Sequence, residues 1–135
     1  MKAWPAVILA LALSAATLPV FASPKSEQNA DVPKYDVSKE AKFKGIVEEV
    51  KDRECPISGG MGSHLMVKID DKIYEVHVAP TKTVKNYEIV FQKGDEVEIT
   101  GMKTTFQGVD AILVREIKRG NDSFVFRDPK GKPIW

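Results

Sequence analysis

Alternation of polar and apolar residues from His64 to Val78 constrains the fold of this chain more than any other feature. The segment reads HLMVKIDDKIYEVHV, and an apolar side chain at every second position is typical of a strand with one buried face. A two-residue turn at Asp70-Asp71 would fold the segment into an antiparallel hairpin. In that register position 69 faces position 72, and His64 lies directly opposite His77.

The same register divides the side chains of the hairpin between two faces. A slip of one residue would exchange the faces, so the pattern fixes the pairing wherever one face is buried. The outer face carries His64, His77, Met66 and Glu75, which makes it the place to look for a polar site. The inner, apolar face is formed by Leu65, Val67, Ile69, Tyr74, Val76 and Val78.

The segments around the hairpin predict an all-β, mainly antiparallel protein. We expect strands over 43–50, 96–102 and 109–117, a loop over 51–63, and a short helix over 81–87 between the third and fourth strands. Three strands, a helix and two strands follow the order of an OB-fold, a five-stranded Greek-key barrel. An immunoglobulin-like sandwich would need two or more further strands. Gly45 is the expected bulge in the strongly bent first strand.

The C-terminal residues predict an extension of the barrel made of a strand and a turn. A short strand is expected over 123–127, and Asp-Pro-Lys-Gly at 128–131 fits a type I turn. The segment Ala111–Val114 is apolar on both faces, so something must cover its outer side. We expect the tail to do so, with Trp135 packing back onto the barrel.

The first residues predict export of the chain. Lys2, an apolar run and small residues before a cut after Ala22 are typical of a secretory signal peptide over 1–22. The alternative is a membrane anchor, but polar residues and prolines interrupt the run that a spanning helix would need. Residues 23–40 are polar and predict a flexible linker, and 41–135 form the barrel domain. We expect a periplasmic or secreted protein, with no membrane association after signal cleavage.

Charge and cysteine content narrow the partners and the sources of stability. The chain has 20 basic and 19 acidic residues, and removal of Lys2 with the leader brings the two into balance. A neutral, exported chain gives no electrostatic case for binding nucleic acid. Cys55 is the single cysteine, so no internal disulfide can form and packing must stabilise the fold.

Several short motifs give the chain a family resemblance. It resembles a group of small exported bacterial OB-fold-like proteins of unknown function, and the resemblance implies an envelope-located barrel without assigned catalysis. The haem-chaperone OB-folds of the periplasm are superficially similar, but their membrane anchor and His-x-x-x-Tyr motif do not occur here. The motifs that carry the resemblance are Gly62-Ser63-His64-Leu65, Val76-His77-Val78-Ala79-Pro80, Gly94-Asp95-Glu96-Val97, Arg115-Glu116-Ile117 and the segment 127–135.

The histidine pair is the main candidate for chemistry. Residues facing each other across antiparallel strands have Cβ atoms about 4.5–5.5 Å apart, which allows both imidazoles to turn toward one ion. Imidazole suits zinc and copper, and further ligands are available in Glu75, Met66, Met61 and Cys55. Cysteine and methionine would favour copper, whereas Glu75 would favour zinc. The alternative is a structural pair of half-buried histidines.

Other motifs have simpler interpretations. Backbone amides of the glycine-rich run 58–63 could bind an anion, but a mobile loop is the favoured interpretation. Cys55 is expected to be at least partly exposed, as a metal ligand or an oxidisable thiol. Asn121-Asp122-Ser123 matches a glycosylation pattern, although turn chemistry is the better interpretation. Because no recognised catalytic constellation is present, we do not expect an enzyme.

Together these features give two hypotheses of different class. The first is a periplasmic OB-fold binding or accessory module that holds copper or zinc at the cross-strand pair. The second is a non-catalytic structural or docking domain of the cell envelope. The expected partner is accordingly another envelope protein or a small ligand.

Overall fold

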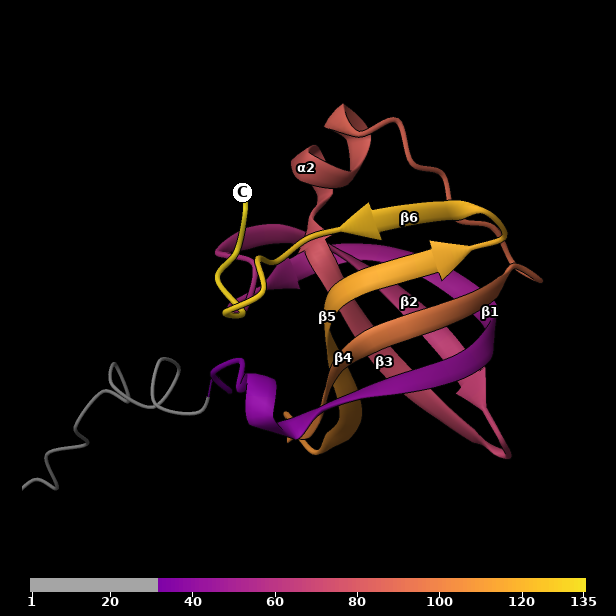
Figure 1. The fold of residues 1–135 in the computed structure, drawn as a ribbon, viewed down its shortest axis with the longest axis horizontal. Coiled ribbons are helices and arrows are strands. Elements are labelled where there is room, and N and C mark those ends of the chain that lie inside the picture. The colour runs from indigo at the N-terminus through magenta and orange to yellow at the C-terminus, as the bar shows by residue number, and fades with distance from the viewer. Residues whose placement is uncertain (1–31) are drawn as a thin grey trace, which may run out of the picture.

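A computed structural model describes residues 32–135, in which six strands form one sheet that curls into a barrel (Figure 1). The sheet order is β3-β2-β1-β4-β5-β6, and a parallel pairing of β3 with β5 closes it. The elements are the 3-10 helix η1 (Val37–Lys39), β1 (Glu40–Cys55), β2 (Gly60–Ile69), β3 (Lys72–Pro80), α2 (Thr81–Asn86), β4 (Glu96–Phe106), β5 (Val109–Arg119) and β6 (Asp122–Val125).

This topology confirms the predicted fold class. Strands β1 to β5 are connected and paired as in an OB-fold, with α2 between β3 and β4 at one end of the barrel (Figure 1). The extra strand β6 pairs with β5 and forms the predicted C-terminal extension. The predicted signal peptide, residues 1–22, and residues 23–31 of the predicted linker lie outside the described residues.

Strand β1 is long and strongly bent, because it takes part in both halves of the barrel. Residues 40–46 pair with β4, and residues 46–55 pair with β2. The bulge falls between Val47 and Glu49 rather than at Gly45. Gly45 serves a different purpose, since a Cβ there would lie 2.6 Å from the carbonyl oxygen of Lys68. The close crossing of β1 over β2 therefore requires glycine at this position.

The predicted loop over 51–63 is largely strand in the structure. Residues 51–55 continue β1, residues 60–63 begin β2, and only 56–59 form the turn between them. The prediction was wrong because the segment 51–54 is charged and lacks alternation. Backbone pairing with β2 nevertheless satisfies its amides and carbonyls, which side-chain patterning does not report.

The structure has two apolar clusters, one inside the barrel and one on the outer side of β5. The main cluster joins the inner faces of all five barrel strands with α2, through Val84, and with Phe126 after β6. The second cluster contains Cys55, Phe106 and Ala111, with Ile57 packed against it. The turn after β1 thus covers the outer side of β5 at Ala111, where the C-terminal tail was predicted to lie.

The segment before β1 and the C-terminal tail lie against each other. The Tyr35 hydroxyl donates a hydrogen bond to Glu40, which also accepts one from Arg115 on β5. The Arg127 guanidinium lies 4.9 Å from the ring centre of Tyr35 and 5.3 Å from that of Trp135. Trp135 therefore stacks on Arg127, although 37% of its surface remains exposed. Within residues 32–135 no helix is long and apolar enough to cross a membrane.

Candidate metal centre

The predicted register of the hairpin is confirmed, and it places the two histidines side by side. Ile69 pairs with Lys72, Leu65 with Val76, and His64 with His77. The pairing is irregular between Ser63 and His64. The imidazole centroids are 4.6 Å apart and the rings are nearly perpendicular, at 82°.

The end of β1 brings Cys55 to this pair. Its Sγ lies 3.4 Å from Nδ1 of His77, and ligand atoms of Cys55, His64 and His77 all lie within 4.8 Å of one another. The carbonyl of Cys55 accepts hydrogen bonds from the amides of Ser58 and Gly59, so the turn holds the residue in place. The expectation that Cys55 would be partly exposed was wrong, because only 2% of it is accessible.

All three donor residues are buried on the outer side of the sheet. His64 is 0% exposed and His77 is 4% exposed, and the ring of Phe106 packs edge-on against His77 at 5.6 Å. Phe106 ends β4, so the turn after β1 and the end of β4 flank the face of β2 and β3. In OB-folds this face and the loops beside it are where ligands bind.

Burial keeps both imidazoles neutral. Loss of solvent, followed by the charges of His64 and Arg53, lowers the pKa of His77 to about 3. Burial and the charge of Arg53 likewise lower the pKa of His64. Neither ring nitrogen of His64 makes a hydrogen bond of ordinary geometry among the described residues, although the nearby backbone of Gly62 and Lys51 opposes the lowering of its pKa. A neutral imidazole with a free lone pair is the form that binds a metal ion.

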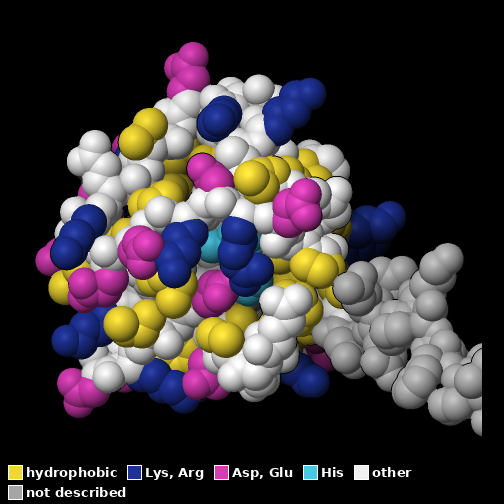
Figure 2. All heavy atoms as spheres, turned by 180° about the vertical axis from the view of Figure 1, so that it is seen from behind, with side chains coloured by type: hydrophobic (Ala, Val, Ile, Leu, Met, Phe, Trp, Pro, Cys, Tyr) yellow, Lys and Arg dark blue, Asp and Glu magenta, His cyan; other side chains and the backbone are white. Residues whose placement is uncertain are grey.

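Glu75 and Arg53 lie above the histidines on the solvent side. The nearer carboxylate oxygen of Glu75, Oε1, is 3.6 Å from Nε2 of His77 and 3.9 Å from Nε2 of His64. Arg53 forms an ion pair with that oxygen, and its side chain is 36% exposed against 13% for Glu75. Figure 2 shows the histidine side chains as a small area visible beneath Lys and Arg side chains on this face.

The two methionines stand apart from the buried donors. Met61 pairs with Glu54 and is 53% exposed, so its thioether faces solvent. Met66 pairs with Glu75 and is partly buried, about 7 Å along the strand from His64. Of the six residues predicted for the site, the structure brings together Cys55, His64 and His77, with Glu75 next to them.

Arg53 and Phe106 belong to the site but were not predicted. Arg53 lies two residues before Cys55, so in an extended strand both side chains point to the same face. The sequence does not indicate this shared face, because the segment lacks alternation and was predicted to be a loop. Gly62 was also missed as a site residue, although a Cβ there would lie 3.2 Å from Cε1 of His64.

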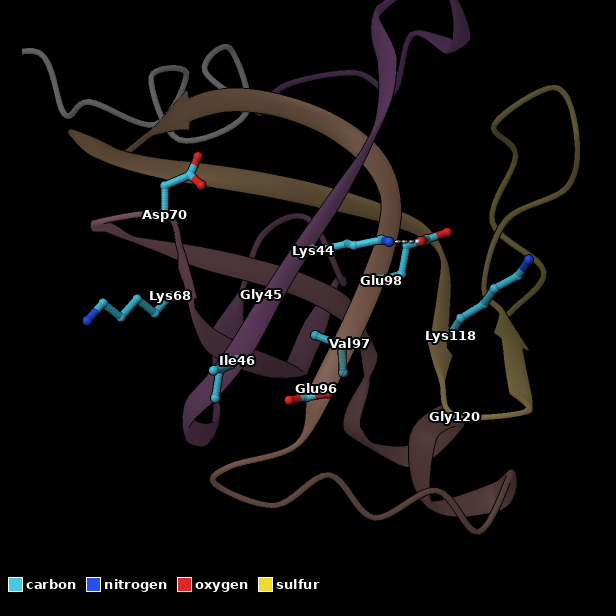
Figure 3. A pocket seen from close by; sticks show the side chains of 10 residues that line it. All are labelled: Lys44, Gly45, Ile46, Lys68, Asp70, Glu96, Val97, Glu98, Lys118 and Gly120. Carbon is cyan, nitrogen blue, oxygen red and sulfur yellow. Dashed lines mark ion pairs between the residues drawn. The ribbon is translucent and has the colours of Figure 1, made fainter.

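A hollow in the surface lies elsewhere and has a different character. It is an open groove of about 670 Å³ over β1 and β4, where Lys44 pairs with Glu98 (Figure 3). No histidine or cysteine reaches it, and its charged side chains carry both signs. Its lining residues are Lys44, Gly45, Ile46, Lys68, Asp70, Glu96, Val97, Glu98, Lys118 and Gly120. The cysteine–histidine cluster is therefore the stronger candidate for a specific function.

Comparison with solved structures gives likenesses of low identity. The second OB-fold domain of replication protein A from Methanococcus maripaludis is 18% identical, with a TM-score of 0.44 over 63% of this chain and 87% of that domain. A TiaS mutant that lacks its ZRD, in complex with agmatine, is 17% identical, with a TM-score of 0.46 over 76% of this chain. The matched region spans only 30% of the TiaS chain.

Comparison with protein families is more informative than comparison with individual proteins. No curated protein matches the sequence. One family model, however, covers the whole barrel from η1 into β6 and includes Cys55, His64 and His77. The chain belongs to the MamS/MamX magnetosome protein family, whose model matches residues 39–124.

Proposed function

We propose that this protein is an accessory protein of the cell envelope, associated with the magnetosome, that binds a copper or zinc ion through Cys55, His64 and His77. The family supports the magnetosome association. The signal peptide predicted over residues 1–22 would direct the chain to the periplasm or the exterior. The metal-binding part of the proposal rests on the buried cluster of one thiol and two imidazoles.

The single observation that carries the proposal is the state of His64. Its side chain is fully buried, and neither nitrogen makes a hydrogen bond of ordinary geometry within residues 32–135. Leaving a buried polar group unpaired costs about 1–3 kcal/mol, so such groups call for an explanation. An ion shared with His77 and Cys55 satisfies His64, because all three offer donors to the same small space.

The chemistry of the donors limits the ion to soft or borderline metals. Thiolate ligands favour copper(I) and zinc, whereas imidazole suits zinc, copper, iron and nickel. A set of one thiolate and two imidazoles is thus best matched by copper or zinc. The cluster is also covered by Glu75 and Arg53, which leaves little access for a substrate. We therefore propose a binding protein rather than an enzyme.

Metal analysis of the full mature chain, purified without a polyhistidine tag, tests this function. We expect about one equivalent of copper or zinc to remain bound to the wild type. Cys55→Ser and His64→Ala should each remove it, while Glu98→Gln, in the groove on the other side of β1, should retain it. Failure of the wild type to bind either metal with a Kd below about 1 µM would overturn the proposal.

A docking role is the second candidate, and one surface feature favours it. Ile46, Lys68 and Ile73 lie in one row across β1, β2 and β3. Both isoleucines are about half exposed, at 46% and 50%, on the same outer face as the histidines. A partner from the envelope that covers this row is the expected ligand if no metal binds.

A further inference from the structure

The two nitrogens of His77 face different groups, so the thiol of Cys55 and the carboxylate of Glu75 lie on opposite sides of its ring. Nδ1 lies 3.4 Å from the Cys55 sulfur, whereas Nε2 lies 3.6 Å from the Glu75 carboxylate. The lone pairs on the two nitrogens of an imidazole point in widely different directions. An ion bound by Cys55 and by Nδ1 of His77 therefore lies on the opposite side of the His77 ring from the carboxylate at Nε2, although that carboxylate also lies 3.9 Å from Nε2 of His64.

Glu75 is also held on the far side by a second residue. Arg53 pairs with the same carboxylate oxygen that faces the imidazoles, and Arg53 is the more exposed of the two. Exposure increases from Cys55 and the two histidines to Glu75 and then to Arg53. Metal-bound histidines commonly donate their remaining N–H to a carboxylate, which fixes the ring and its tautomer, and Glu75 occupies the position of that acceptor.

We propose, on the basis of the function proposed above, that Glu75 is a positioning residue rather than a ligand and that the Arg53–Glu75 pair makes the site selective for copper(I) over zinc. With Glu75 engaged by Arg53 and by Nε2–H of His77, the protein offers three donors. The 3.6 Å separation between Nε2 of His77 and the Glu75 carboxylate exceeds a hydrogen bond, and a ring movement of less than about 1 Å would close it.

Coordination number and charge both favour copper(I) in such a site. Structural zinc in a protein is almost always held by four protein donors, and here a fourth protein donor, the Glu75 carboxylate, would have to be taken from Arg53. Copper(I) accepts three donors, and its single charge is neutralised by the Cys55 thiolate. A zinc ion with the same three donors would leave a net positive charge buried below Arg53, which is unfavourable without a partner.

The test compares the binding of copper(I) and zinc to five forms of the mature protein: wild type, Glu75→Gln, Arg53→Gln, Cys55→Ser and Glu98→Gln. Dissociation constants come from competition with chromophoric chelators under reducing conditions. X-ray absorption of the copper(I) complex gives the number of donors and the presence of sulfur. Circular dichroism of each metal-free variant checks that the barrel is retained.

We expect the wild type to bind copper(I) more tightly than zinc, through three donors that include one sulfur. Glu75→Gln should keep this donor set and weaken copper(I) binding by about tenfold to hundredfold, the usual effect of losing an outer partner. Arg53→Gln frees the carboxylate and removes a positive charge, so zinc binding should tighten. Glu98→Gln, a carboxylate paired with Lys44 away from the cluster, should match the wild type.

Different results would overturn different parts of the argument. Loss of binding in Glu75→Gln as complete as in Cys55→Ser, or a fourth donor that disappears in Glu75→Gln, would make Glu75 a ligand. Zinc binding tighter than copper(I) binding in the wild type would refute the selectivity. Absence of binding in the wild type, or full binding in Cys55→Ser, would instead refute the proposed function itself.

Discussion

At the scale of single residues, His64 illustrates how a binding site and a core position make opposite demands. The next residue along β2, Leu65, faces the main core and is fully buried. His64 is buried as completely on the other side of the strand, but neither of its ring nitrogens makes a hydrogen bond of ordinary geometry within residues 32–135. Burial that satisfies no hydrogen bond stabilises the fold less than burial of an apolar side chain of similar size.

This contrast predicts an unusual response to substitution. His64→Leu in the metal-free protein should leave the free energy of unfolding unchanged or raise it, because it removes an unsatisfied group and keeps the volume. Leu65→Ala, one position along, should cost about 2–5 kcal/mol. Urea unfolding of the two variants and the wild type in the presence of a chelator measures both effects. A loss of more than about 2 kcal/mol in His64→Leu would mean that His64 has partners in the folded protein.

At the scale of elements, the crossing of β1 over β2 depends on the absence of a side chain at Gly45. A Cβ there would approach the carbonyl oxygen of Lys68 and Cγ1 of Val67 to 2.6 Å each. Gly45→Ala should therefore push the strands apart and cost about 1–3 kcal/mol. Lys44→Ala, on the exposed neighbour, should change stability by less than about 0.5 kcal/mol. Thermal unfolding of both variants distinguishes a steric effect from a general sensitivity of β1.

The same strand shows what sequence patterning can and cannot predict. Alternation located β2 and β3 to within a few residues and placed His64 opposite His77, because one apolar face fixes the register of a hairpin. Residues 51–55 escaped prediction because KDREC has no alternation, and those residues are extended only through pairing with β2. Since Arg53 and Cys55 lie there, the register of the histidines could be predicted but the complete site could not.

A second element-scale contact links the start of β1 to β5, and it predicts a dependence of stability on pH. The hydrogen bond from Arg115, which outweighs the opposing effect of partial burial, lowers the pKa of Glu40 below its usual 4.5. Folding therefore favours the ionised carboxylate. This stabilisation is complete above the unfolded-state pKa, near 4.5, and is lost as the pH falls through the lower, folded-state value.

The corresponding experiment is urea unfolding of Glu40→Gln at pH 7 and at pH 3. At pH 7 the variant should be less stable than the wild type by about 1.5–3 kcal/mol, the worth of a hydrogen bond to a charged group. The difference should shrink at pH 3, because protonation then weakens the wild-type contact as well. Glu96→Gln, on an exposed side chain at the start of β4, serves as the control. An equal difference at both pH values would show that the charge of Glu40 contributes nothing.

At the scale of the whole molecule, strand pairing closes the barrel, and side-chain contacts hold the C-terminal tail and the segment before β1 against it. The pairing of β3 with β5 spans only three residue pairs, so the seam is short. Around it, Phe126 inserts into the main core and the tail folds back over the segment before β1. The topology could be predicted from the order of elements, whereas these contacts join residues far apart in sequence and leave no local pattern.

The contacts between the C-terminal tail and the segment before β1 depend on Arg127. It is 7% exposed, lies over the rings of Tyr35 and Trp135, and donates a hydrogen bond of 2.9 Å to the carbonyl of Gly131. A guanidinium is planar and stacks on aromatic rings, whereas the ammonium of lysine is a hydrated point charge. Arg127→Lys therefore keeps the charge but removes the stacking and the forked donor.

We expect Arg127→Lys to lower the free energy of unfolding by about 1–2 kcal/mol, since a cation–π contact is worth about 0.5–1 kcal/mol at an exposed site and about 2 kcal/mol when desolvated. Hydrogen exchange of residues 32–39 should accelerate more than exchange in β2 and β3, because the ring of Tyr35 loses the guanidinium that lies over it while the core of the barrel is unchanged. Arg53→Lys, on a half-exposed side chain outside this contact, should leave exchange in that segment unchanged. If residues 32–39 exchange at the wild-type rate in Arg127→Lys, the contacts with Glu40 and Arg115 alone hold this segment. The C-terminal tail then does not stabilise it.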